Sequence, residues 1–166
     1  MSEQLRIILI IIVSVSIFGL LIFVFVKNYI KNKINYYLNI KNSVKQKLTC
    51  HCKNIEIDVK LTNGLNDLYR CNCSMCKRKG TIIAIVPKKN LEIVKGQKDI
   101  TFYQFNTNVA KHFFCNVCGI STHSQRRSDP NTYGINVGCL DGISPQELFN
   151  LDVRINDGQN HTKDRK

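Results

Sequence analysis

Residues 115–119 read "CNVCG" and residues 50–52 read "CHC". Two cysteines separated by two residues and followed by glycine are typical of a metal-binding knuckle, because the glycine relieves crowding where the backbone turns. The CHC pair can bring two more thiolates to the same ion from a neighbouring strand or turn. These two motifs therefore predict one closed four-thiolate zinc site that joins distant parts of the chain. Its ligands would be Cys50, Cys52, Cys115 and Cys118.

A third cysteine cluster lies between these two motifs. Residues 71–76 read "CNCSMC" and contain three thiols, those of Cys71, Cys73 and Cys76. A structural zinc usually takes four protein ligands, whereas a catalytic zinc takes three and keeps one position open. The triplet therefore predicts a second, open zinc site, so that two Zn²⁺ ions are expected per chain.

The N-terminal part of the chain is strongly apolar. Residues 7–26, from Ile7 to Val26, carry no charge and as a helix would span about 30 Å, the thickness of a bilayer's hydrocarbon core. A cleavable signal peptide has a shorter apolar region and a basic start, whereas here Glu3 offsets Arg6. We predict a single transmembrane helix at 7–26, in contact with lipid, after a short tail at 1–6.

Basic residues follow the apolar run, whereas only Arg6 precedes it. Because positive residues are retained on the cytoplasmic side, we expect a single-pass membrane protein whose soluble domain faces the cytosol. Residues 27–46 are interpreted as a basic juxtamembrane linker, either a solvated stalk or an amphipathic helix lying on anionic lipid. The lysines concerned are Lys27, Lys31, Lys33, Lys41, Lys45 and Lys47.

Location and charge restrict the remaining function classes. In a reducing compartment, clustered thiols indicate a metal or catalytic site rather than a disulfide framework. The net charge is +12, and residues 27–47 supply half of it, so nucleic acid is not expected as a partner. The sequence contains neither a GxSxG motif nor a glycine-rich phosphate loop.

From Leu48 onward the pattern changes to short strands separated by turns. Residues 55–61 alternate apolar and polar, and residues 81–87 form the continuous apolar run of a buried strand. A helix is predicted to begin at Ser144, where Glu147 completes a capping box. These features predict a mainly β domain at 47–161, followed by a tail at 162–166. Further strands are expected at 100–105, 111–115, 132–137 and 151–155.

Taken in order, the motifs resemble those of the glutathione-dependent formaldehyde-activating enzymes and their relative centromere protein V. The resemblance covers residues 47–161 and implies a β-tent fold, in which the CHC and CNVC cysteines form the structural zinc site and the triplet holds a catalytic zinc. The family's glycines around CHC, which serve a turn, are missing here, since Leu48 and Thr49 precede the motif and Lys53 and Asn54 follow it. The resemblance rests on "CHC", "CNCSMCKRKG", "AKHFFCNVCGI", "RRSDPNTYGINVGCLD" and "NDGQNH".

The reaction implied by the resemblance is addition of the glutathione thiol to formaldehyde, which is carbon-sulfur lyase chemistry. An open zinc position can stabilise a thiolate or polarise a carbonyl oxygen, so the substrate is itself a candidate for the fourth ligand. Arg126 and Arg127 can bind glutathione carboxylates bidentately, although adjacent arginines are also typical of a solvated face.

Three side chains of the protein compete with the substrate for the fourth position. Cys139 is interpreted as a buried core thiol that could still approach either site. His112 lies three residues before Cys115 and is expected to pack beside the closed site. His51 is expected to point away from the site that its neighbours face, if the local chain is extended.

Two function classes stay open at the level of sequence. One is a membrane-anchored zinc-dependent lyase, and the other is a non-catalytic, zinc-folded binding module tethered to a membrane. The three thiols of the triplet favour the lyase, because a purely structural domain needs only the closed site.

Overall fold

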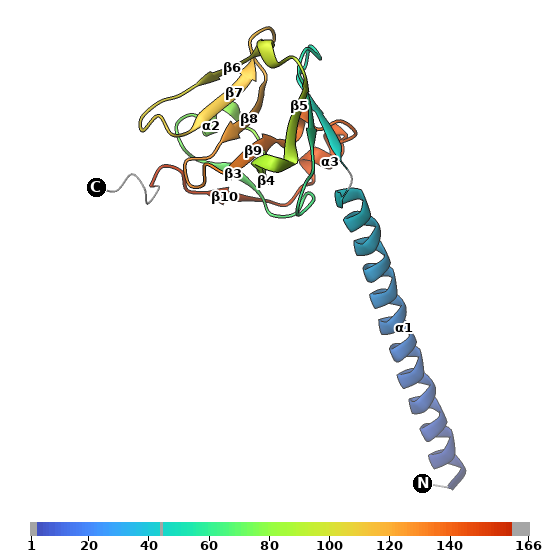
Figure 1. The fold of residues 1–166 in the computed structure, drawn as a ribbon. Coiled ribbons are helices and arrows are strands. Elements are labelled where there is room, and N and C mark those ends of the chain that lie inside the picture. Colours follow the sequence, from blue (N-terminus) through green and yellow to red (C-terminus); the bar gives the residue numbers. More distant parts are fainter. Residues whose placement is uncertain (1–2, 44, 161–166) are drawn as a thin grey trace. The chain divides into compact units, whose positions relative to one another are not determined.

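The computed structural model describes residues 3–43 and 45–160, which belong to two units, Met1–Ile40 and Lys41–Lys166. The predicted tail at 162–166 and residue 161 lie outside the described residues. Helix α1, Glu3–Ser43, 41 residues long, provides the described part of the first unit, and its last three residues are counted with the second (Figure 1). The helix begins before Ile7 and continues through most of the predicted linker, since no proline interrupts it.

Helix α1 exposes its apolar side chains. Leu20 is 63% exposed and Phe25 is 72% exposed, in a helix whose segment Glu3–Lys31 is long and apolar enough to cross a membrane by length and composition. A helix that is apolar on all sides requires an apolar environment, either a protein core or lipid.

The second unit is built mainly from β strands, as predicted. A small sheet has the order β1-β2-β5 and a large sheet the order β10-β3-β4-β9-β8-β7-β6. The small sheet contains β1 (Gln46–Thr49), β2 (Glu56–Val59) and β5 (Leu91–Lys95). The large sheet contains β3 (Leu68–Cys71), β4 (Ile83–Pro87), β6 (Ile100–Tyr103), β7 (Lys111–Cys115), β8 (Ser121–Gln125), β9 (Thr132–Asn136) and β10 (Val153–Asn156).

Short helices complete the second unit. The capping box predicted at Ser144 is present: its hydroxyl accepts from the Glu147 N–H at 3.2 Å, and the Glu147 carboxylate accepts from the Ser144 N–H at 2.8 Å. The helices are α2 (Cys76–Lys79), α3 (Pro145–Phe149) and the 3-10 turns η1 (Lys88–Asn90), η2 (Gln97–Asp99) and η3 (Val137–Cys139).

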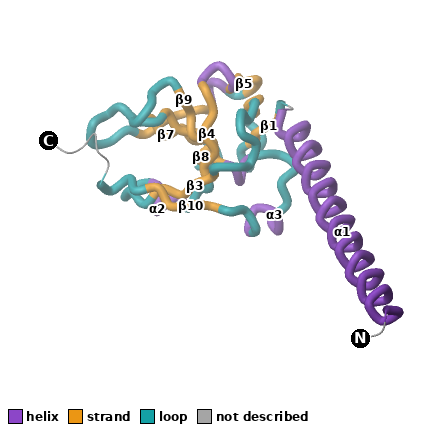
Figure 2. The backbone as a smooth tube through the Cα atoms, turned by 90° about the horizontal axis from the view of Figure 1, so that it is seen from below, coloured by secondary structure: helices purple, strands orange, loops and turns teal. Residues whose placement is uncertain are grey.

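One pairing in the large sheet is parallel. Strand β10 lies beside β3 (Figure 2), with Val153 opposite Leu68 and Asn156 opposite Cys71, whereas the other strand pairs are antiparallel. This pairing brings residues near the C-terminus next to the start of the cysteine triplet, 85 positions earlier in the chain.

The hydrophobic core joins the two sheets. Leu48 and Ile57 from the small sheet are completely buried in the same cluster as Val86 and Ile135 from the large sheet. Each such side chain contributes roughly 1.5–3 kcal/mol through burial. The two sheets thus form one folding unit, within which the cysteine clusters are positioned.

Candidate metal centres

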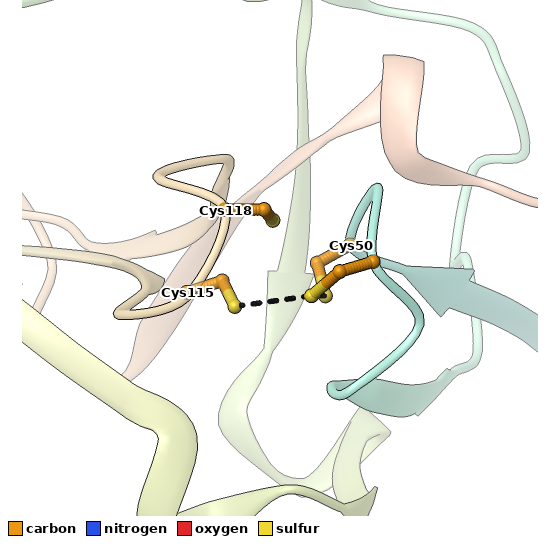
Figure 3. A group of neighbouring side chains, drawn as sticks. Cys50, Cys115 and Cys118 are labelled. Atoms are coloured by element: carbon orange, nitrogen blue, oxygen red, sulfur yellow. Dashed lines mark hydrogen bonds between the residues drawn. The ribbon is translucent and has the colours of Figure 1, made fainter.

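The closed cluster forms where the two sheets meet. Cys50 follows β1, whereas Cys115 ends β7, and all four predicted sulfurs lie within 4.8 Å of one another. Cys115 and Cys118 face Cys50 from the opposite turn (Figure 3). The Sγ atoms of Cys50 and Cys52 are 3.5 Å apart, and those of Cys52 and Cys115 are 3.7 Å apart.

Backbone N–H groups prepare these sulfurs to carry negative charge. The Ile55 N–H donates to Cys50 Sγ at 3.3 Å. Burial acts to raise the pKa of Cys118, but backbone hydrogen bonds from Cys52 and Ile120 outweigh it and lower that pKa to about 6. Thiolates are the form in which cysteine binds metal, so these bonds favour the ligating state of Cys118. At Cys52 a backbone hydrogen bond acts to lower the pKa, but burial and the neighbouring thiols outweigh it and raise that pKa to about 12.

The CHC turn uses an unusual residue. Lys53 has φ 59°, in the left-handed region, and its N–H donates to the Cys50 carbonyl at 3.0 Å. Glycine adopts this conformation without the steric cost of a Cβ. The turn therefore places a lysine in a conformation that glycine adopts more easily.

The triplet is local in sequence and more exposed. Cys71 ends β3, Cys76 begins α2, and the three sulfurs lie within 4.8 Å of one another. Hydrogen bonds from the Cys71 and Cys76 thiols, together with the Cys76 backbone N–H at 3.4 Å, lower the pKa of Cys73. Three thiol donors at this spacing can hold a metal ion.

A loop after β10 is fastened to the triplet through Asn72. The Asn72 side-chain oxygen accepts from the backbone N–H groups of Gly158 at 2.8 Å and Gln159 at 3.0 Å, and its amide donates to Asp157 at 3.1 Å. A Cβ at Gly158 would lie 2.4 Å from Cys71 Sγ. Only glycine therefore allows the loop to approach the sulfur so closely. We call residues 157–160 the strap.

The triplet lines a cavity of about 350 Å³. Arg126 and Arg127 both lie on its wall, and no acidic residue is among its described lining residues. Arg126 is held by a hydrogen bond to Thr132 Oγ1 at 3.1 Å. Burial raises the pKa of the Tyr69 phenol on the same wall, and Arg126 acts in the opposite direction. The cavity is thus positively charged and suited to an anionic ligand.

Of the three candidates for a fourth ligand, Cys139 is the buried core thiol that was predicted, whereas His112 lies elsewhere than predicted. Cys139 belongs to neither cluster among the described residues: its thiol lies in the core, 3.3 Å from Asn136 Nδ2, and burial raises its pKa to about 12. His51 is exposed. His112 lines the cavity of the triplet, so the prediction that it packs beside the closed site is wrong.

Two other residues near the triplet did not come out of the sequence reasoning. Lys79 lies three positions after Cys76, a spacing that places two side chains on the same face of a helix. Tyr69 lies two positions before Cys71 in β3, a spacing that places two side chains on the same face of a strand. Both spacings could have been used to find them.

Comparison with known proteins connects this site to a family. The family model described as glutathione-dependent formaldehyde-activating enzyme matches residues 45–155. A curated relative from Emericella nidulans, whose name assigns it provisionally to the same enzymes, is 26% identical over 83 residues, covering 48% of this chain and 42% of its own length. A crystal structure of a Rhodobacter sphaeroides protein is similar at 48% identity with a TM-score of 0.63, covering 66% of this chain and 99% of its own.

Proposed function

Because the chain belongs to the glutathione-dependent formaldehyde-activating enzyme family, we propose that it is a membrane-anchored, zinc-dependent carbon-sulfur lyase that joins glutathione to formaldehyde or a related small carbonyl compound. The observation that supports the proposal is a cluster of three thiols that lines a cavity of about 350 Å³ together with two arginines. That volume falls in the range of about 300–1,000 Å³ used for small-molecule ligands.

Zinc fits both thiol clusters, and we propose one ion in each. Zinc-sulfur bonds of about 2.3 Å place the sulfurs of a tetrahedral site about 3.8 Å apart. In the closed cluster the Sγ atoms of Cys50 and Cys52 lie 3.5 Å apart, and those of Cys52 and Cys115 lie 3.7 Å apart. Thiolates are soft donors and favour zinc over the hard cations magnesium and calcium.

The residues of the cavity would perform the binding step. Arg126 and Arg127 can form bidentate hydrogen bonds with the two carboxylates of glutathione. When bound by the triplet, zinc would supply a Lewis acid that favours the thiolate form of a thiol or polarises a carbonyl oxygen. In the reaction the thiol sulfur bonds to the carbonyl carbon, and the thiol proton ends on the carbonyl oxygen.

The catalytic proposal is tested with the full-length protein in detergent. Nuclear magnetic resonance exchange spectroscopy would measure the rate at which formaldehyde and glutathione interconvert with their adduct. We expect acceleration over the spontaneous reaction. If the protein accelerates the reaction no more than free zinc does, the lyase proposal is wrong and the chain is a non-catalytic, zinc-folded binding module.

The arginine assignment is tested with a substitution and a second thiol. A charge-assisted hydrogen bond contributes about 1.5–3 kcal/mol, so Arg127→Gln is expected to raise KM for glutathione about tenfold or more. The matched control is 2-mercaptoethanol, which has no carboxylate and should show the same KM with both proteins. An equal rise in KM for glutathione and for 2-mercaptoethanol would contradict carboxylate binding by Arg127.

Membrane anchoring is proposed for the exposed apolar helix α1. The segment Glu3–Lys31 has the length and composition of a membrane span, and the lysines after it favour a cytosolic domain. In sealed vesicles with the cytosolic side outward, added protease should digest the domain. Protection of the domain, or glycosylation at Asn160, would contradict this orientation.

A further inference from the structure

We propose that His112 is a catalytic residue that donates a hydrogen bond from Nε2 to the carbonyl-derived oxygen of the substrate, and that Lys79 is a positioning residue that fixes the required tautomer. This inference rests on the proposed function, because it assigns a residue to that reaction.

The position of His112 satisfies the first requirement, access to the reacting groups. Its side chain is 6% exposed and lies on the wall of the cavity that also contains Cys73 and Cys76. Its ring stacks on Phe105, with centroids 5.7 Å apart and planes inclined by 20°. A buried ring held between a strand and an aromatic side chain keeps one orientation.

The neighbourhood of Lys79 determines which ring nitrogen carries the proton. Lys79 Nζ lies 3.2 Å from His112 Nδ1 and 3.0 Å from Ser121 Oγ. A lysine ammonium only donates hydrogen bonds, so both neighbours must accept. Ser121 is consistent with this direction, because its own hydroxyl donates to the Phe113 carbonyl at 3.3 Å. His112 Nδ1 is therefore an acceptor, and the proton of the neutral ring is on Nε2.

The donor on Nε2 is free for a ligand within the described structure. No residue between 3–43 or 45–160 forms a hydrogen bond with this atom, although the ring is mostly buried. Burial, and then the charge of Lys79, lower the pKa of His112 to about 4, so the ring is neutral at physiological pH. The Lys79 charge behind Nδ1 also polarises the Nε2–H bond and makes it a stronger donor.

The reaction needs a donor of this kind. As the sulfur bonds to the carbonyl carbon, the electron pair of the carbon-oxygen π bond moves to the oxygen, which later receives the thiol proton. A neutral N–H that points to this oxygen stabilises the developing charge without being consumed, and it does the same in the reverse cleavage. Oxyanion donors of this type contribute about 10²–10³-fold to kcat.

The activity test uses full-length protein and two substitutions of the same residue. His112→Phe keeps an aromatic ring against Phe105 but removes the donor, and is expected to lower kcat by about 100-fold or more. His112→Gln retains an N–H group near the position of Nε2 and should recover most of the loss. The matched control is His123→Phe on β8, which is 3% exposed and does not line the cavity, and should leave kcat unchanged. Zinc content and circular dichroism establish that each variant is folded.

A spectroscopic test reads the tautomer independently of activity. In the ¹⁵N spectrum of full-length protein labelled at histidine, His112 should show a protonated Nε2 and a hydrogen-bonded, unprotonated Nδ1. Lys79→Met should shift the Nδ1 resonance and lower kcat, with unchanged KM. A protonated Nδ1 in the unmodified protein, or an unchanged kcat in folded His112→Phe, would overturn this inference alone. A full-length protein without catalytic acceleration would instead overturn the proposed function, and with it the role of His112.

Discussion

The two thiol clusters of this chain differ in almost every structural respect. The closed cluster joins sulfurs from turns of both sheets, 63 residues apart between Cys52 and Cys115, and Cys115 is completely buried. The triplet lies within residues 71–76, is only partly buried and opens into a cavity. A site that connects distant segments stabilises the fold, whereas a local site with a free side can act on a ligand.

Because the closed cluster joins distant segments and the triplet does not, loss of a cysteine from the closed cluster should reduce the stability of the domain most. Cys118→Ser is expected to unfold the domain, because structural zinc contributes about 10 kcal/mol or more to folding and a small domain is stable by about 5–15 kcal/mol. Circular dichroism and zinc analysis would measure this. Cys139→Ala, which removes a thiol outside both clusters, is the control. A cooperatively folded Cys118→Ser protein with unchanged zinc content would contradict the closed site.

Removal of a triplet thiol should have a different result. We expect Cys73→Ser to lower the zinc content from about two ions per chain toward one, to abolish catalytic acceleration and to leave the domain folded. Metal analysis and circular dichroism on the same sample would show this. If the variant unfolds as Cys118→Ser does, and cobalt spectra show four protein ligands at both metals, the triplet is a second closed site.

The strap provides a more moderate perturbation of the triplet. In Gly158→Ala the new Cβ would lie 2.4 Å from Cys71 Sγ, so the loop must move away from the sulfur. Loss of such support typically weakens metal binding by about 10–100-fold, which a competitive chelator titration would measure. Gly138→Ala, where the nearest atom is 3.4 Å from the added Cβ, should bind metal normally. Equal affinities for the two variants would show that the strap does not support the triplet.

The smallest effect is expected at the turn of the closed cluster. Lys53→Gly keeps the left-handed conformation and removes its steric cost, which is about 1–2 kcal/mol for a residue with a side chain. Glycine also loses more conformational entropy on folding, roughly 0.5–1 kcal/mol. The net result should be a stabilisation of about 1 kcal/mol or less, visible as a small rise in Tm. A marked fall in Tm would show that the lysine side chain stabilises the turn.

The sequence predicted the two thiol clusters and the mainly β character because both depend on local patterns. It did not predict β8, with the polar sequence STHSQ, whose Thr122 and His123 are buried because the strand lies between β7 and β9. Thr122 Oγ1 and His123 Nδ1 lie 3.0 Å apart and form a hydrogen bond with each other. A polar strand of this kind is defined by its neighbours and not by its own pattern.

The position of His112 was predicted wrongly from the sequence, although strand geometry could have given the correct position. Sequence proximity to Cys115 suggested a role beside the closed site. In a strand, however, residues three positions apart lie on opposite faces. Both residues belong to β7, so the cysteine faces its cluster and the histidine faces the cavity of the other cluster.

The parallel pairing of β10 with β3 depends on long-range packing and could not be inferred from either segment alone.

That parallel pairing also orders events during synthesis of the protein. Asn72 is translated 86 residues before Gly158, its partner in the strap. At about 5–20 residues per second, roughly 4 to 17 seconds separate their appearance on the ribosome. During this interval the three thiols of the triplet exist without the loop that holds them. The triplet is therefore held by the strap only once Gly158 has been made, after the segments that form the closed cluster.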